Sequence, residues 1–314
     1  MRILVAGGAG FVGSHLVELL VEAGDEVVVV DNLLTGSAAN LGHLAPDRVT
    51  LVRANAEDAH DGEFERVYHL ASPASPEAYE RHQVATLSAN SDGTRRLLDV
   101  AVRCGARFLL ASTSEVYGDP LEHPQRETYW GNVDPIGPRS MYDEAKRFAE
   151  ALTVAYVRER RADARIVRIF NAYGPRMQLD DGRMPSAFIA AALRGEPLTI
   201  HGDGSQTRSL CYVRDTVRGL FAAMERGRAG EVYNIGRADE FTVFEFARRA
   251  IRAAQSESTL RFAAPRPQDI QRRRPDGTKA ERELGWVAGT SLDVGLRETI
   301  EWYRSVIDRV GVPL

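Results

Sequence analysis

Residues 2–13, Arg-Ile-Leu-Val-Ala-Gly-Gly-Ala-Gly-Phe-Val-Gly, decide the fold class of this chain. The apolar first half predicts a short buried strand, and Gly7, Gly10 and Gly13 follow with the spacing GxxGxxG. An amphipathic helix is predicted from about residue 13 to residue 23. Glycines at such a strand–helix turn let the backbone approach a pyrophosphate, while the helix N-terminus presents free N–H groups. The stretch therefore indicates a dinucleotide site rather than only a tight turn.

Asp31 ends the second predicted strand, at residues 26–31, where a carboxylate accepts hydrogen bonds from an adenosine ribose. The carboxylate would repel a 2′-phosphate, and no arginine follows in the next few residues, so the pattern favours NAD over NADP. An aspartate that merely caps the strand is the alternative. Further residues expected at the cofactor are Phe11, Val12, Asn32, Asn55, Leu70 and Ala71.

Short apolar runs alternate with longer amphipathic segments through the first half of the chain. Further strands are predicted at about 49–53, 66–70, 107–112 and 165–170, with one helix at about 84–103 and another around residues 142–146. Strands that alternate with helices at this spacing predict an α/β fold, a doubly wound parallel sheet of the Rossmann type.

The sequence pattern changes after Asn171, where the predicted elements become shorter and turn-forming residues become more frequent. We expect residues 1–171 to form the NAD-binding domain and residues 172–314 mainly a smaller α/β substrate-binding lobe. The chain is expected to return to the sheet domain at about 209–237, where Val232-Tyr-Asn-Ile predicts a further strand.

The composition is that of an ordinary soluble globular protein of 314 residues, with 44% hydrophobic and 27% charged residues and a net charge of −4. Arginines are dispersed among acidic residues, so no nucleic-acid partner is expected. No apolar stretch approaches the roughly 18 residues of a membrane span, and nothing at the N-terminus predicts a signal peptide. Cys104 and Cys211 form neither metal spacing nor a disulfide framework. We expect a cytoplasmic protein without a metal.

Only two of the 40 basic residues are lysines, and one of them is Lys146 in the run Ser140-Met-Tyr-Asp-Glu-Ala-Lys146. Tyr142 and Lys146 are four residues apart and so share one face of a helix. A neighbouring ammonium and a nicotinamide cation would both lower the tyrosine pKa from its ordinary value of about 10. Tyr142 could then act as a general base on a hydroxyl. An incidental lysine on a solvated helix face is the alternative.

Polar side chains follow the strand predicted at 107–112, where the sequence continues Thr113-Ser-Glu115. In an open parallel sheet, ligands bind at the carboxyl ends of the strands. Thr113, Ser114 and Glu115 are therefore expected to face the reacting group beside the nicotinamide. The alternative is a solvated loop, and the glycine motif upstream and the Tyr142–Lys146 motif downstream argue against it.

With these motifs in place, the chain resembles the extended short-chain dehydrogenase/reductases that act on nucleotide sugars, and among them the UDP-glucuronate decarboxylases. The resemblance covers nearly the whole chain. Its most specific stretches are His69-Leu-Ala-Ser-Pro-Ala-Ser-Pro76, residues 110–120, Tyr129-Trp-Gly and Pro135-Ile-Gly-Pro-Arg139. Sugar-nucleotide 4,6-dehydratases usually carry Asp-Glu where this chain has Ser114-Glu115, and simple 4-epimerases usually lack the glutamate.

The resemblance implies NAD-dependent conversion of UDP-glucuronate to UDP-xylose, through oxidation at C4, loss of CO₂ and re-reduction at C4. It makes Tyr142 the base, Lys146 its partner and Thr113, Ser114 and Glu115 the polar active-site triplet. It implies a homodimer built through a four-helix bundle. Residues implied for the UDP-sugar, with Arg208 and Arg273 at its diphosphate, are Asn171, Arg176, Gln206, Arg208 and Arg273.

Two other functions stay open at this point: a UDP-glucuronate 4-epimerase or other nucleotide-sugar epimerase/dehydratase, and a non-catalytic sensor of NAD or nucleotide sugars. The chain also departs from the family pattern in four places, one of them Ala172, where a bulkier residue is usual. Asn55 stands where an aspartate is common, Gln83 where a proline is common and Ser88 where a lysine is common. We expect altered sugar specificity, if any, at Gln83 and Ser88.

Overall fold

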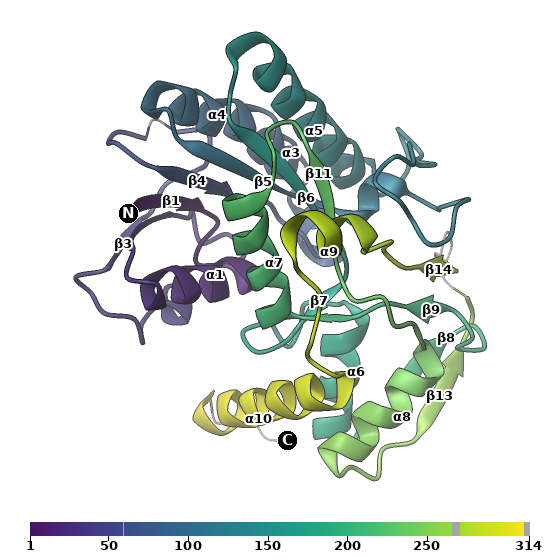
Figure 1. Cartoon of the computed structure of the whole chain (residues 1–314). Coiled ribbons are helices and arrows are strands. Elements are labelled where there is room, and N and C mark those ends of the chain that lie inside the picture. Colours follow the sequence, from purple (N-terminus) through teal and green to yellow (C-terminus); the bar gives the residue numbers. More distant parts are fainter. Residues whose placement is uncertain (59, 266–270, 311–314) are drawn as a thin grey trace.

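A seven-stranded parallel sheet forms the centre of the larger lobe (Figure 1). The computed structural model describes residues 1–58, 60–265 and 271–310, the last three of them by their backbone alone. The strand order is β11-β6-β5-β4-β1-β2-β3. Their bounds are β1 (Arg2–Ala6), β2 (Glu26–Val30), β3 (Val49–Val52), β4 (Arg66–His69), β5 (Arg107–Thr113), β6 (Ala164–Ile169) and β11 (Val232–Ile235). The order reverses between β1 and β4, and such a switch point is where open α/β sheets bind ligands.

Both faces of the sheet are covered by helices, which explains why its strands are almost continuously apolar. Along β1, Ile3 and Val5 enter the core on one face, whereas Leu4 and Ala6 enter the core on the other. The first face packs against α1 (Phe11–Glu22) and α7 (Val213–Arg226), and the second against α4 (Asp92–Cys104) and α5 (Ser140–Arg160). The doubly wound parallel sheet predicted from the sequence is confirmed.

The single helix predicted at about 84–103 is wrong, because the chain breaks at Ser91 into α3 (Gln83–Asn90) and α4. A further short helix, α2 (Pro76–Arg81), precedes them. Polar side chains donate hydrogen bonds to backbone carbonyls at the break. Ser91 Oγ donates to Leu87 O at 2.8 Å, and Thr94 Oγ1 donates to Asn90 O at 2.7 Å. Such local bonds compete with a continuous helix.

The smaller lobe has its own apolar core, formed largely by α6 (Met184–Leu193), α8 (Val243–Ala254) and α10 (Leu292–Val310) (Figure 1). Three small sheets border it: β13 (Leu260–Ala263) with β8 (Leu198–His201), β10 (Cys211–Tyr212) with β7 (Ala172–Tyr173), and β12 (Phe241–Thr242)-β9 (Thr207–Arg208)-β14 (Arg272–Arg273). The helix α9 (Thr278–Leu284) packs back on α7 and β11 of the larger lobe. Two 3₁₀ turns, η1 (Ala38–Asn40) and η2 (Ser114–Tyr117), complete the elements named here.

The described part of the chain contains no helix long and apolar enough to cross a membrane. Within the same residues, no cluster of three or more His, Cys, Asp or Glu side chains could hold a metal ion. Cys104 and Cys211 are both free thiols.

Candidate active site

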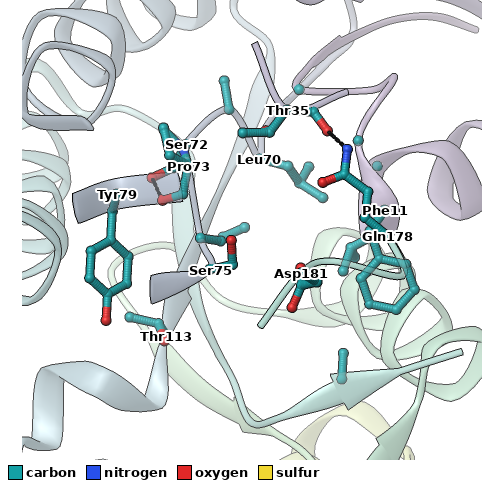
Figure 2. A pocket seen from close by; sticks show the side chains of 18 of the residues that line it. Phe11, Thr35, Leu70, Ser72, Pro73, Ser75, Tyr79, Thr113, Gln178 and Asp181 are labelled. Carbon is teal, nitrogen blue, oxygen red and sulfur yellow. Dashed lines mark hydrogen bonds between the residues drawn. The ribbon is translucent and has the colours of Figure 1, made fainter. Parts of the chain in front are cut away.

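A cavity of about 730 Å³ lies at the carboxyl ends of the central strands and extends to the smaller lobe. In Figure 2, Tyr79 and Thr113 lie at one end of it, and Phe11 and Gln178 at the other. Of the residues predicted to bind cofactor or substrate, or to act in catalysis, all except Gln206 line this cavity. The sequence motifs therefore converge on one place, although they lie as far apart in the chain as Gly7 and Arg273.

The glycine turn leaves no room for side chains. A Cβ at Gly7, whose φ is +81°, would lie 2.5 Å from Ala71 N, and a Cβ at Gly13 would lie 2.0 Å from Gly7 O. Gly10 caps α1 without a side-chain hydrogen bond, and no acidic residue occupies the first turn. The first N–H groups of α1 thus face the cavity without a side-chain competitor, a cradle that suits a pyrophosphate.

Asp31 is held at the end of β2 by two backbone bonds. Its carboxylate accepts from Ala9 N at 3.0 Å and from Leu33 N at 2.8 Å. Burial raises the pKa of Asp31, while these two N–H groups oppose the rise. Next to it, Asn32 Nδ2 donates to Asn55 Oδ1 at 3.0 Å, so the asparagine that departs from the family pattern keeps an acceptor role. This end of the cavity fits the adenosine of a dinucleotide.

Lys146 is buried beneath Tyr142 on the inner face of α5. Its Nζ donates to Ala111 O, at the end of β5, at 2.9 Å and lies 5.9 Å from the centre of the Tyr142 ring. Burial lowers the pKa of Lys146 to about 7, and the carboxylate of Glu150 one turn further along α5 opposes that shift. The ammonium form is therefore held in the site at a cost in free energy.

The lowering of the Tyr142 pKa predicted from the sequence is wrong for the protein alone. Burial raises the pKa of Tyr142, while a hydrogen bond with Thr113 and the charge of Arg183 oppose the rise. Tyr79 of α2 contributes to this burial, because its ring stacks on that of Tyr142 at 5.1 Å with an angle of 9° between planes. Tyr79 was missed by the sequence analysis, since nothing in its local pattern indicates the stack.

Two arginines hold Glu115 from opposite sides. Arg139 Nη2 donates to one carboxylate oxygen, Oε2, and Arg273 Nη1 to the other, Oε1. Burial alone would raise the pKa of Glu115, but the charges of Arg273 and Arg139 outweigh it and hold the pKa below its ordinary value. Glu115 is therefore a carboxylate in this site. Arg139 was missed as a site residue, although it ends the family-specific stretch before Tyr142.

A second buried carboxyl, Asp143, lies behind Arg139. Its Oδ2 is 3.9 Å from Arg139 Nε, and it is 6% exposed. Burial and the negative charge of Glu115 raise the pKa of Asp143 to about 7, against the opposing charge of Arg139. The site thus contains one firmly ionised carboxylate and one that titrates near neutral pH.

The residues expected to hold the nucleotide sugar differ in whether they line the cavity and in whether their polar atoms already have partners in the protein. Asn171 and Arg208 line the cavity, and Asn171 Nδ2 is buried with no hydrogen-bond acceptor among the described residues. Arg176 lines it too, but its Nη2 pairs with Glu18 of α1 at 2.5 Å. Gln206 does not line it, and its amide donates instead to His201 O at 2.8 Å.

Gln83 and Ser88, the expected sites of altered specificity, both lie in α3 but outside the cavity lining, to which Ala85 and Ala89 of the same helix belong. The sequence analysis also missed Arg183, which lines the cavity and forms a forked ion pair with Asp181.

Comparison with known proteins agrees with this geometry. The model of the NAD dependent epimerase/dehydratase family matches residues 3–236. UDP-glucuronic acid decarboxylase 1 of Arabidopsis thaliana is 50% identical over 308 residues, which cover 98% of this chain and 71% of that protein. UDP-glucuronic acid decarboxylase 6 of the same plant is 49% identical, over 100% of this chain and 91% of its own.

Among solved structures, the dTDP-glucose 4,6-dehydratase DesIV of Streptomyces venezuelae, with NAD and TYD bound, superposes with a TM-score of 0.88. It is 32% identical, and the match covers 98% of each chain. One assignment follows from these relatives, from the cradle at Gly7 and Gly13 and from the Tyr142–Lys146 pair. The chain belongs to the NAD dependent epimerase/dehydratase family, and its relatives at about half identity are UDP-glucuronic acid decarboxylases.

Proposed function

We propose that this protein is an NAD-dependent decarboxylase that converts UDP-glucuronate to UDP-xylose. The observation that carries the proposal is the placement of Glu115 between Arg139 and Arg273 beside Tyr142. A lone carboxylate at this position would repel a uronate. Two guanidinium groups around one carboxylate leave a net positive charge, and this charge attracts a second carboxylate. Ser114, in place of a dehydratase aspartate, supplies no second carboxyl acid for 4,6-elimination.

The residues of the site account for the proton transfers of such a reaction. Tyr142, held by Thr113 and with Lys146 beneath it, takes the proton of the C4 hydroxyl as the hydride leaves C4. When bound, NAD accepts that hydride and later returns it, so it is not consumed. The 4-keto sugar is a β-keto acid, and its C5 carboxylate leaves as CO₂ while the electrons pass to the C4 oxygen. Tyr142 and Thr113 donate hydrogen bonds to that enolate oxygen. C5 then takes a proton from solvent, and Tyr142 returns its proton to the C4 oxygen as the hydride returns to C4.

Product analysis tests the proposal. The protein is incubated with UDP-glucuronate and NAD, and CO₂ and the nucleotide products are measured. We expect CO₂ and a pentose nucleotide in equal amounts, and no product from the Tyr142→Phe variant. The exposed Arg158→Gln variant, on the same helix, serves as the control and keeps full activity. A C4-epimerised uronate without CO₂ would identify a 4-epimerase instead, and bound but unconverted nucleotide would favour a sensor.

We further propose that two copies associate through α3 and α5, which pack against each other on one side of the sheet. Val84 and Leu87 of α3 are 76% and 43% exposed, and Phe148 of α5 is 51% exposed. A pair of helices from each of two copies would bury these apolar side chains in a four-helix bundle. Light scattering at micromolar concentration is expected to give a dimer, and Phe148→Glu a monomer. A wild-type monomer would contradict this proposal.

A further inference from the structure

The position of the substrate carboxylate is constrained by the proposed chemistry, on which this inference rests. The carboxylate is carried by C5, the carbon bonded to C4, and the C4 hydroxyl must meet the phenol oxygen of Tyr142. The group that binds the carboxylate therefore has to line the cavity within a few bond lengths of Tyr142. It also needs a donor that the protein itself does not already use.

The basic side chains that line the cavity differ in how many of their donors are already used. Arg273 is 4% exposed, and its two terminal nitrogens donate to Glu115 and to Gly118 O. Arg183 turns Nε and Nη2 toward Asp181. Arg176 Nη2 pairs with Glu18, and Lys146 Nζ donates to Ala111 O. Arg208 Nη1 donates to Thr207 O at 2.9 Å. Arg176 keeps an Nη1 without a partner among the described residues, but its guanidinium lies against Glu18 and His43.

Arg139 combines an unused donor with a position in the same turn as Tyr142. Only its Nη2 is used, in the bond to Glu115, and no hydrogen bond among the described residues engages its Nη1. Its side chain is 33% exposed, against 5% for that of Arg273, and it lines the cavity. Tyr142 N donates to Arg139 O at 3.0 Å, so the two residues belong to the same first turn of α5. A free guanidinium nitrogen thus lies in the same turn as the proposed base.

We infer that Arg139 binds the C5 carboxylate of the uronate through Nη1 and thereby distinguishes a uronate from a neutral hexose. Its guanidinium fork is then shared between Glu115 and the substrate, a geometry that suits two carboxylates side by side. While Asp143 is protonated and the substrate carboxylate is present, the charges of the two arginines and the two carboxylates balance. When the substrate carboxylate leaves as CO₂, a net positive charge returns beside the electron-rich enolate and stabilises it.

Binding measurements separate this role from a general contribution to the site. Dissociation constants for UDP-glucuronate and UDP-glucose are measured by calorimetry with NAD present. A Tyr142→Phe background prevents turnover. Adding Arg139→Gln is expected to weaken UDP-glucuronate about 10- to 100-fold, as for loss of a hydrogen bond between charged groups, and UDP-glucose less than about threefold. Arg139→Lys, which keeps the charge without the fork, is expected to fall between. Arg158→Gln in the same background is the matched control.

Equal weakening of both ligands would overturn the inference, because it would mean that Arg139 only orders the site. Unchanged binding of both would overturn it as well. A circular dichroism spectrum and melting curve of each variant exclude loss of the fold, and Arg139→Lys supplies a second reading if the glutamine variant is unstable. The decarboxylation assay on the wild type tests the proposed function separately, because the preference for a carboxylate can be measured whether or not CO₂ is released.

Discussion

Replacing the active-site lysine is expected to abolish activity and, at the same time, to stabilise the protein. The pKa of Lys146 is lowered by burial from 10.5 to about 7. At about 1.36 kcal/mol for each pKa unit, the difference of about 3.5 corresponds to a penalty of about 5 kcal/mol on the ammonium, as an upper limit below pH 7. Lys146→Met removes the penalty but also the bond to Ala111 O, at about 1–2 kcal/mol. We expect a net gain of up to about 3–4 kcal/mol in the free energy of unfolding at pH 6.

The pH dependence of this gain follows from the direction of the pKa shift. Between pH 7 and 10.5 the unfolded chain binds more protons at Lys146 than the folded protein does, so the wild type gains stability as the pH rises. The advantage of Lys146→Met is therefore largest below pH 7 and should shrink by about 2–3 kcal/mol by pH 9. The measurement is urea unfolding at pH 6 and 9, on protein freed of bound nucleotide because ligands stabilise the folded state.

The only other lysine of the chain provides the control. Lys279 pairs with Glu231 at 2.7 Å, donates to Val232 O at 2.7 Å and is 20% exposed. Lys279→Met removes these contacts and is expected to lower stability by about 1 kcal/mol. If Lys146→Met is less stable than the wild type at pH 6, or if its advantage is the same at both pH values, the account of Lys146 as a strained ammonium is refuted.

Three further predictions concern the surroundings of the site. Glu150→Gln leaves Arg168, its partner at 2.6 Å, without a countercharge and should cost about 3 kcal/mol in urea unfolding. Adding Arg168→Met should recover most of this loss, and additive losses would contradict the pairing. The pKa of Asp143 is raised to about 7, so this residue becomes negatively charged above that pH and repels the substrate carboxylate. The KM for UDP-glucuronate should therefore rise between pH 6 and 8 in the wild type and stay constant in Asp143→Asn. Gly13→Ala places a Cβ 2.0 Å from a backbone oxygen and should weaken NAD binding, measured by calorimetry, at least about 100-fold. Gly277→Ala has open space around its Cβ and should bind NAD normally. Equal affinities of the two variants would contradict the proposed pyrophosphate cradle.

The features that could be predicted from sequence are those set by neighbouring residues. Burial of β1 and β2 on both faces follows from their apolar runs, and the turn at Gly7 to Gly13 follows from the spacing of its glycines. Tyr142 and Lys146 share a face because four residues make about one helical turn. The break at Ser91 was missed because side-chain bonds to backbone carbonyls decide where the helix ends.

The features that could not be predicted depend on contacts between distant segments. Glu115 and Arg273 are 158 residues apart and meet only when β14 of the smaller lobe closes on the end of β5. Tyr79 stacks on Tyr142 from a separate helix. The direction of the Tyr142 pKa shift also lies outside local reasoning, since it is the balance between burial and a few charges that the folded protein alone specifies.

The use of lysine at position 146 in an arginine-rich chain is explained by comparison with two arginines that lie near the core, Arg165 and Arg168. Arg165 is 1% exposed, and its nitrogens reach the carbonyls of Phe108 and Gly227 and the carboxylate of Asp163. Arg168 has Glu150, a tyrosine hydroxyl and a further carbonyl. Around Lys146, the described residues provide one acceptor, Ala111 O. A guanidinium there would bury several donors without partners and could not lose its charge, whereas an ammonium with a pKa near 7 needs fewer partners and can relax by releasing its proton.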